Sequence, residues 1–180
     1  MLRAVILLLF FTTQVIANDA LQGKKAISLV EFQGKEIPIG TIDFFTKKKK
    51  ISYQINIDHN LFKDFFLSMK EMKCLEGAEL WCHLPYPYEN PRIVSQQDLR
   101  WLSHDLLFMY KKKSEFGANF YNGIYYHFSI KGNEIVGVAQ AVDLNQLAAP
   151  PEDMTTPPIT DSDREEMELK HRWLPKLIIR

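Results

Sequence analysis

The chain has 180 residues, of which 46% are hydrophobic and 24% are charged. This composition is that of an ordinary globular domain and excludes an intrinsically disordered chain. The 22 basic and 22 acidic side chains balance, so the chain lacks the overall positive field that attracts nucleic acid. We therefore expect a core of domain size and no nucleic-acid partner.

The first residues have the three-part pattern of a secretory signal peptide. Arg3 supplies a positive charge, residues 4–11 are uniformly apolar, and Ala17 ends a short stretch of small and aliphatic residues. The apolar run is shorter than the roughly 20 residues that span a bilayer; a retained anchor and a cytosolic strand are the alternatives. We expect cleavage after Ala17, a periplasmic or secreted mature protein, and no stable membrane span after cleavage.

The chain has two cysteines, Cys74 and Cys82, with Gly77 between them. An isolated pair in an exported protein is expected to form a disulfide, and the glycine allows the short ring to turn. A redox pair or a metal site is the alternative, but the spacing is neither Cys-x-x-Cys nor a recognised zinc pattern. We expect a structural disulfide, no metal and no cofactor.

The first half of the mature chain predicts a three-stranded meander. Alternating apolar and polar residues over 51–58 indicate a half-buried strand, with a partner over 36–45 and a weaker first strand over 27–32. A shift in the apolar phase of the second strand predicts a bulge near Gly40. The four lysines at 47–50 form the turn, as a solvated tip or, alternatively, an anion-binding tip.

Two segments then change to the period of an amphipathic helix. The first, over 62–72, has an apolar stripe formed by Phe62, Phe65, Met69 and Met72. The second begins at Ser95, ends at the lysines 111–113, and has a stripe formed by Leu99, Leu102, Leu106 and Met109. His104 lies opposite this stripe, and we expect it to be solvated.

Alternation returns over 124–130 and 134–142, which predicts a second hairpin. The remaining segment, 143–180, begins with a proline-rich arm, continues with a short helix over about 162–172, and ends in apolar residues that we expect to dock on the body, an added edge strand being one way. The predicted fold is α+β: residues 1–17 are the signal peptide, and 18–142 form one domain. In it, an antiparallel sheet of about five strands carries helices on one face, and 143–180 is docked on it.

His83 is the candidate catalytic residue. It follows Cys82 and precedes a proline-stiffened loop, and Glu79 or Glu89 is near enough in sequence to orient its imidazole as a general base. The alternative is a histidine that is hydrogen-bonded to the loop backbone. The corresponding function would be that of a small exported hydrolase.

Aromatic residues form the second constellation. Tyrosine and tryptophan combine an apolar ring with a polar group, which suits contact with a peptide, a glycan or an envelope protein. The alternative is that these rings belong to the core. On the first interpretation the chain is a non-catalytic binding or cell-envelope accessory protein, and its contact residues are Trp81, Tyr86, Tyr88, Tyr125 and His127.

Overall fold

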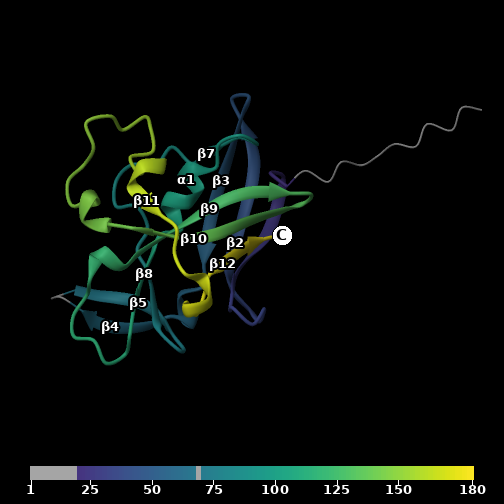
Figure 1. Ribbon diagram of the computed structural model, residues 1–180. Coiled ribbons are helices and arrows are strands. Elements are labelled where there is room, and N and C mark those ends of the chain that lie inside the picture. The colour runs from purple at the N-terminus through teal and green to yellow at the C-terminus, as the bar shows by residue number, and fades with distance from the viewer. Residues whose placement is uncertain (1–19, 68–69) are drawn as a thin grey trace, which may run out of the picture.

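A computed structural model describes residues 20–67 and 70–180, and these form one open sheet of twelve strands (Figure 1). All of the strand pairs are antiparallel. The expected α+β fold with about five strands and two helices is therefore wrong. The predicted signal peptide and its cleavage at Ala17 lie outside the described residues, within which no helix has the length and apolarity of a membrane span.

The sheet order is β4-β5-β6-β8-β9-β10-β12-β1-β2-β3-β7, with β11 paired to β10. The strands are β1 (Gly23–Val30), β2 (Glu36–Lys47), β3 (Lys50–Ile57), β4 (Lys63–Leu67), β5 (Lys70–Glu76), β6 (Leu80–His83), β7 (Ile93–Val94), β8 (Phe108–Lys111), β9 (Gly123–Lys131), β10 (Glu134–Val142), β11 (Arg164–Glu165) and β12 (Lys176–Ile179). The helices of the described residues are α1 (Arg100–Asp105) and the 3₁₀ turns η1 (His59–Leu61), η2 (Phe120–Asn122), η3 (Leu144–Leu147), η4 (Asp161–Asp163) and η5 (Leu169–His171).

The strands with clear alternation are present where the sequence places them. β1, β2 and β3 form the expected meander, and β9 and β10 form the expected second hairpin. The register of β1 against β2 shifts where Ile27 faces Gly40 and Ser28 faces Pro38, so Ile39 is the extra residue of a bulge. A Cβ atom on Gly40 would lie 2.3 Å from the carbonyl oxygen of Asn56, so this position requires glycine.

The helix expected over 62–72 is wrong, because this segment forms the hairpin of β4 and β5. Phe66 is 74% exposed between the half-buried Phe65 and the buried Leu67, which is the period of a strand. The sequence over 62–72 is compatible with an amphipathic helix and with a strand. The pairing of β5 with β6 favours the strand. Met69, a member of the expected stripe, lies outside the described residues.

The helix expected over 95–113 is also largely wrong, since only α1 is helical and β8 follows it. Residues 106–109 are all fully buried, which one face of a surface helix cannot achieve. These four residues lead from the end of α1 into β8, which lies between β6 and β9, and they alternate between the two hydrophobic clusters. The short helix expected over 162–172 is replaced by η4, β11 and η5.

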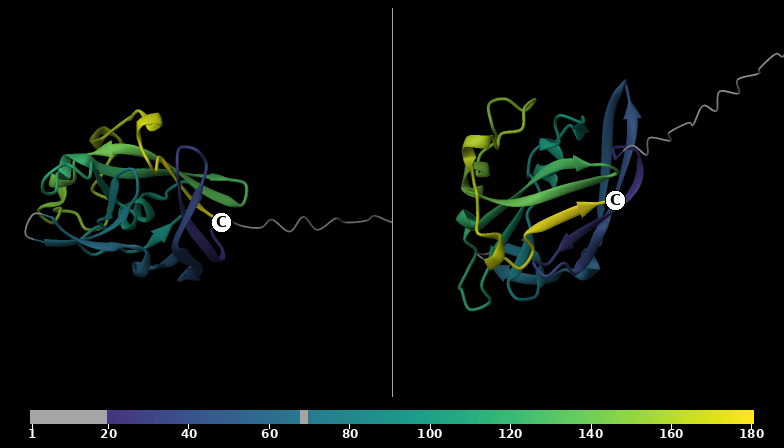
Figure 2. Two further views of the ribbon diagram at one scale, coloured as in Figure 1. Left: turned by 90° about the horizontal axis from the view of Figure 1, so that it is seen from below. Right: turned by 45° about the vertical axis from the view of Figure 1, so that its right-hand side comes forward.

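The apolar tail pairs inside the sheet rather than at an edge. β12 lies between β10 and β1, with Ile179 facing Ile135 on one side and Ile27 on the other (Figure 2). Leu177 and Ile179 are fully buried. β12 therefore connects the meander to the remaining strands.

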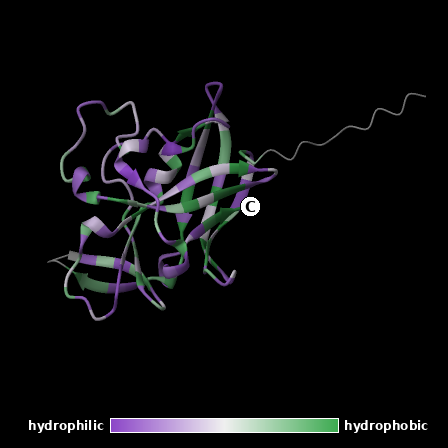
Figure 3. Cartoon of the chain, viewed as in Figure 1, coloured by the Kyte–Doolittle hydropathy of each residue, from purple (hydrophilic) through white to green (hydrophobic). Residues whose placement is uncertain are grey.

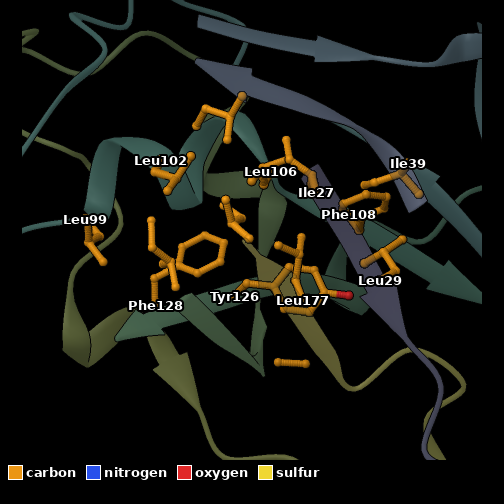
Figure 4. Close-up of a cluster of buried hydrophobic side chains, with 14 of the residues drawn as sticks. Ile27, Leu29, Ile39, Leu99, Leu102, Leu106, Phe108, Tyr126, Phe128 and Leu177 are labelled. Atoms are coloured by element: carbon orange, nitrogen blue, oxygen red, sulfur yellow. The ribbon is translucent and has the colours of Figure 1, made fainter. Parts of the chain in front are cut away.

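Hydrophobic residues concentrate on the strands, and most turns are hydrophilic (Figure 3). Neighbouring residues of β6, β8 and β9 alternate between two clusters, because successive side chains of a strand point to opposite faces. Trp81, Phe108 and Tyr126 belong to the first cluster, which also contains Leu102 and Leu177 (Figure 4). The second cluster receives the intervening residues Cys82, Met109 and Tyr125.

His104 joins the proline-rich arm to α1. It is fully buried, contrary to the solvated position expected for it. Its Nδ1 lies 2.8 Å from the carbonyl oxygen of Arg100, and its Nε2 accepts a hydrogen bond of 3.2 Å from the backbone N–H of Ile159. Burial lowers the pKa of His104 from 6.5 to about 4. The imidazole is therefore neutral at neutral pH, with Nε2 free to accept.

This contact predicts a loss of stability in mild acid. A histidine with a lowered folded-state pKa contributes its full stability above pH 6.5 and loses it as the pH falls towards 4, because the unfolded state then binds the proton more tightly. The full effect is about 3 kcal/mol in the free energy of unfolding. Urea unfolding at several pH values between 7 and 4.5 measures this change in the free energy of unfolding. His104→Gln should flatten the slope, whereas His171→Gln, which alters an exposed histidine, should not; equal slopes in all three proteins would contradict the assignment.

Candidate functional site

The predicted disulfide between Cys74 and Cys82 is confirmed. The two residues face each other directly on β5 and β6. The bridge closes a short loop and so restricts the unfolded chain. It also fixes the β5–β6 turn, residues 77–79, relative to the sheet.

Trp173 packs on this turn. A Cβ atom on Gly77 would lie 2.0 Å from the indole ring, so the indole occupies the space that any larger residue would need. The backbone N–H of Phe32 donates a hydrogen bond of 3.2 Å to the carbonyl oxygen of Trp173. Trp173 therefore connects the β5–β6 turn to the β1–β2 turn.

Glu79 stabilises this arrangement through its hydrogen bonds. Its buried carboxylate accepts a hydrogen bond of 2.6 Å from Arg172 Nη1 and one of 3.0 Å from the backbone N–H of Trp173. The Arg172 guanidinium also lies 4.0 Å from the centre of the Tyr110 ring. Glu79, expected to orient a catalytic histidine, is instead part of a structural ion pair.

These segments, together with Leu61 and Lys63, line a groove of about 900 Å³. Phe32 and Leu61, which line it, are 59% and 45% exposed. A concave apolar surface with a few polar groups is the usual form of a binding site. We call this site the Trp173 groove; its apolar lining residues are Phe32, Ile37, Pro38, Leu61, Leu75, Ala78 and Trp173.

Charged residues of both signs surround the Trp173 groove. Glu31 pairs with Lys35, and Glu76 pairs with Lys63 at 2.7 Å and with Lys113 at 3.2 Å. These two lysines lower the pKa of Glu76. The charged residues that line the groove therefore include both signs, and the groove carries no strong net charge.

His83 does not meet its expected partners. Its Nε2 lies 2.9 Å from the carbonyl oxygen of Asp105, and its ring packs on Phe62 and Phe108. Burial lowers the pKa of His83. Glu89 is exposed, and no contact recorded among the described residues joins His83 to Glu79 or Glu89.

The aromatic residues expected to form one contact surface lie in different parts of the structure. Tyr86 lies 5.4 Å from Tyr88, 6.0 Å from Trp101 and 5.5 Å from His104, measured between ring centres. Tyr86 is only 6% exposed, and the hydroxyl of Tyr88 donates to the carbonyl oxygen of Leu147. The loop over 83–91, which we call the proline-aromatic loop, thus packs inward at Tyr86 and Tyr88.

Trp81 lies on the opposite face of the sheet, where its Nε1 donates to the hydroxyl of Tyr126 at 3.2 Å. It is fully buried. The structure therefore does not bring Trp81 together with the proline-aromatic loop, although they are close in sequence.

Tyr125 and His127 line a second cavity of about 590 Å³, together with Arg164. The guanidinium of Arg164 lies 4.4 Å from the centre of the Tyr125 ring and donates to His127 Nδ1 at 3.0 Å and to Gln140 Oε1 at 2.7 Å. It also forms an ion pair with Asp161. Burial and the charge of Arg164 lower the pKa of His127. These contacts fasten the proline-rich arm to the sheet.

Sequence reasoning missed the residues of the Trp173 groove because four segments that are distant in sequence supply them. The apolar character of Trp173 was a signal that the tail docks, but no local pattern identifies its partners Gly77 and Phe32. No family model, curated protein or solved structure matches the chain significantly. Its site is therefore assigned from the geometry alone.

The inward packing of the proline-aromatic loop predicts that Tyr86→Ala lowers the free energy of unfolding by about 3 to 5 kcal/mol, as truncation of a buried aromatic residue does. Tyr121→Ala is the matched control: Tyr121 is 69% exposed, and its loss should change stability by less than about 0.5 kcal/mol. Thermal and urea unfolding measure both. If the Tyr86→Ala protein were as stable as the control, the inward packing of the loop would be contradicted.

Proposed function

We propose that this chain is an exported, non-catalytic binding protein that holds an apolar polypeptide segment in the Trp173 groove. The observation that carries the proposal is the groove of about 900 Å³, in which Phe32 is 59% exposed. Exposed aromatic residues in a rigid concave site are typical anchors of binding surfaces. Export is supported by the sequence pattern before Ala17 and by the disulfide, since such bonds persist in oxidising compartments.

The charges of the groove favour binding over catalysis. A general base works best when its pKa lies near the operating pH, but the pKa of Glu76 is lowered and Glu79 is bound to Arg172. The hydrolase hypothesis also loses its expected geometry, because the imidazole of His83 is hydrogen-bonded to the backbone carbonyl of Asp105. The groove is thus better suited to hold a ligand than to transform it.

The balance of positive and negative residues around the groove indicates the class of ligand. Paired charges of both signs give no strong attraction for a polyanion or a polycation. Apolar contacts with Phe32, Leu61 and Trp173 would supply most of the binding energy. A peptide with one or two large apolar side chains satisfies both conditions; a glycan stacked on the same aromatic rings is the alternative outcome.

The three tryptophans of the chain provide a direct test. Peptides selected from a random display library on the purified mature protein are titrated while the indole N–H resonances are followed by NMR. The signal of Trp173 should shift, and those of Trp81 and Trp101, which are 0% and 6% exposed and lie outside the groove, should not. A glycan array is screened in parallel.

A pair of matched double variants locates the site. Phe32→Ala with Leu61→Ala should weaken peptide binding at least tenfold, or about 1.4 kcal/mol. Phe66→Ala with Phe116→Ala removes two exposed aromatic rings elsewhere and should leave the affinity unchanged. Equal affinity in both double variants would sink the proposal, and binding of glycans alone would replace the peptide as its ligand.

A further inference from the structure

The tip of the β2–β3 hairpin has an unusual backbone for its residues. Lys48 and Lys49 form a two-residue turn in which φ is 50° and 65°. Such turns favour Asn-Gly, because two consecutive left-handed residues strain other side chains. Arg92, from the segment before β7, has a φ of 52°. Among the described residues these are the non-glycine residues with positive φ, and all three carry a positive charge.

The charges at this tip repel one another. Lys47 and Lys50 are directly opposite in the β2–β3 pair, where like charges are unfavourable. None of the lysines 47–50 takes part in an ion pair within the described part of the chain. Of the nearby acids, Asp105 is already bound to Arg92 at 3.0 Å, and Glu89 lines an adjoining hollow with Lys50. Within the described residues, the positive charges of the four lysines at 47–50 are therefore not neutralised by ion pairs, although Glu89 lines a hollow with Lys50.

An apolar residue accompanies the charges. Phe45 is 43% exposed and lies two residues before Lys47, on the same face of β2. A hollow of about 440 Å³ separates this face from the Arg92 segment; it is lined by Phe45, Lys47, Lys50, Ser52, Tyr53 and Arg92. The tip thus combines cations, an exposed aromatic ring and room for a small anionic group.

We propose that the β2–β3 tip docks the protein on a membrane surface that contains anionic phospholipids. The hairpin extends beyond the body of the molecule, and its hydrophilic end is free to reach a flat surface (Figures 1 and 3). Each lysine or arginine near such a surface contributes to binding, and an aromatic ring at the same level enters the interface. The hollow of about 440 Å³ lined by Lys47, Lys50 and Arg92 would receive the headgroup phosphate.

This site is separate from the Trp173 groove. The groove contacts β2 at Ile37 and Pro38, and the tip begins at Lys47. Ten residues of strand span about 30 Å. A protein held by the tip would therefore leave the groove accessible, and either site can fail its test without affecting the other.

Co-sedimentation of the mature protein with vesicles tests the proposal. The protein should bind vesicles of phosphatidylcholine with phosphatidylglycerol, bind poorly to phosphatidylcholine alone, and dissociate as the salt concentration rises. The variant K47Q/K48Q/K49Q/K50Q should lose at least about tenfold in affinity. The matched control K112Q/K131Q/K170Q/K176Q removes the same number of exposed lysines elsewhere and should bind as the wild type does.

A second variant separates binding from folding. Lys48→Asn with Lys49→Gly supplies the residues that the turn prefers and should raise Tm, yet it removes two charges and should weaken vesicle binding. Equal loss in the control variant, or equal binding to both kinds of vesicle, would overturn the proposal. Binding to immobilised heparin without binding to vesicles would also overturn it and assign the tip to an acidic polysaccharide.

Discussion

The pairing of β12 between β10 and β1 is the constraint on which the rest of the structure depends. Hydrogen bonds link this segment to both neighbours, from the N–H of Ala139 to the carbonyl oxygen of Pro175 at 2.9 Å and between Ala26 and Arg180 at 2.8 and 3.1 Å. Without β12, both β10 and β1 would present an unpaired edge. The first cluster would also lose Leu177 and Ile179, which are fully buried.

The shape of the Trp173 groove depends on this pairing. Trp173 lies three residues before β12, so the strand fixes where the indole meets Gly77 and where its carbonyl oxygen meets Phe32. The ion pair of Glu79 with Arg172 and the disulfide fix the β5–β6 turn on which Trp173 packs. The segment that ends in β12 therefore contributes both to the core and to the Trp173 groove, and a change that loosens β12 would alter the groove as well.

Local pattern predicted the parts of the fold in which one face is buried and the other is solvated. The alternation over 51–58 and 124–142 predicted β3, β9 and β10, and the isolated pair of cysteines in a chain expected to be exported predicted the disulfide. The pattern failed over 106–109, where both faces are buried and no alternation remains. It also failed over 62–72, where a helical stripe and a strand fit the same residues, and for β12, whose neighbours are set by long-range pairing.

For the candidate site, too, local sequence identified individual residues but not their partners. His83, Glu79 and the tyrosines were chosen for their chemistry, but their partners, Asp105, Arg172 and His104, come from elements that no local spacing connects to them. The lysine turn was predicted in place, whereas its union with Arg92 depends on the pairing of β3 with β7. Local sequence therefore identifies side chains that could carry chemistry, but it does not predict which distant residues they contact.

Amide hydrogen exchange, followed residue by residue, tests the central role of β12 most directly. If β12 connects the two parts of the sheet, the amides of Leu177, Ile178 and Ile179 exchange only through global unfolding, at rates that match those at the centres of β1 and β10. Rapid exchange of these three amides, while β1 and β10 stay protected, would contradict the account, since the sheet would then hold together without its last strand.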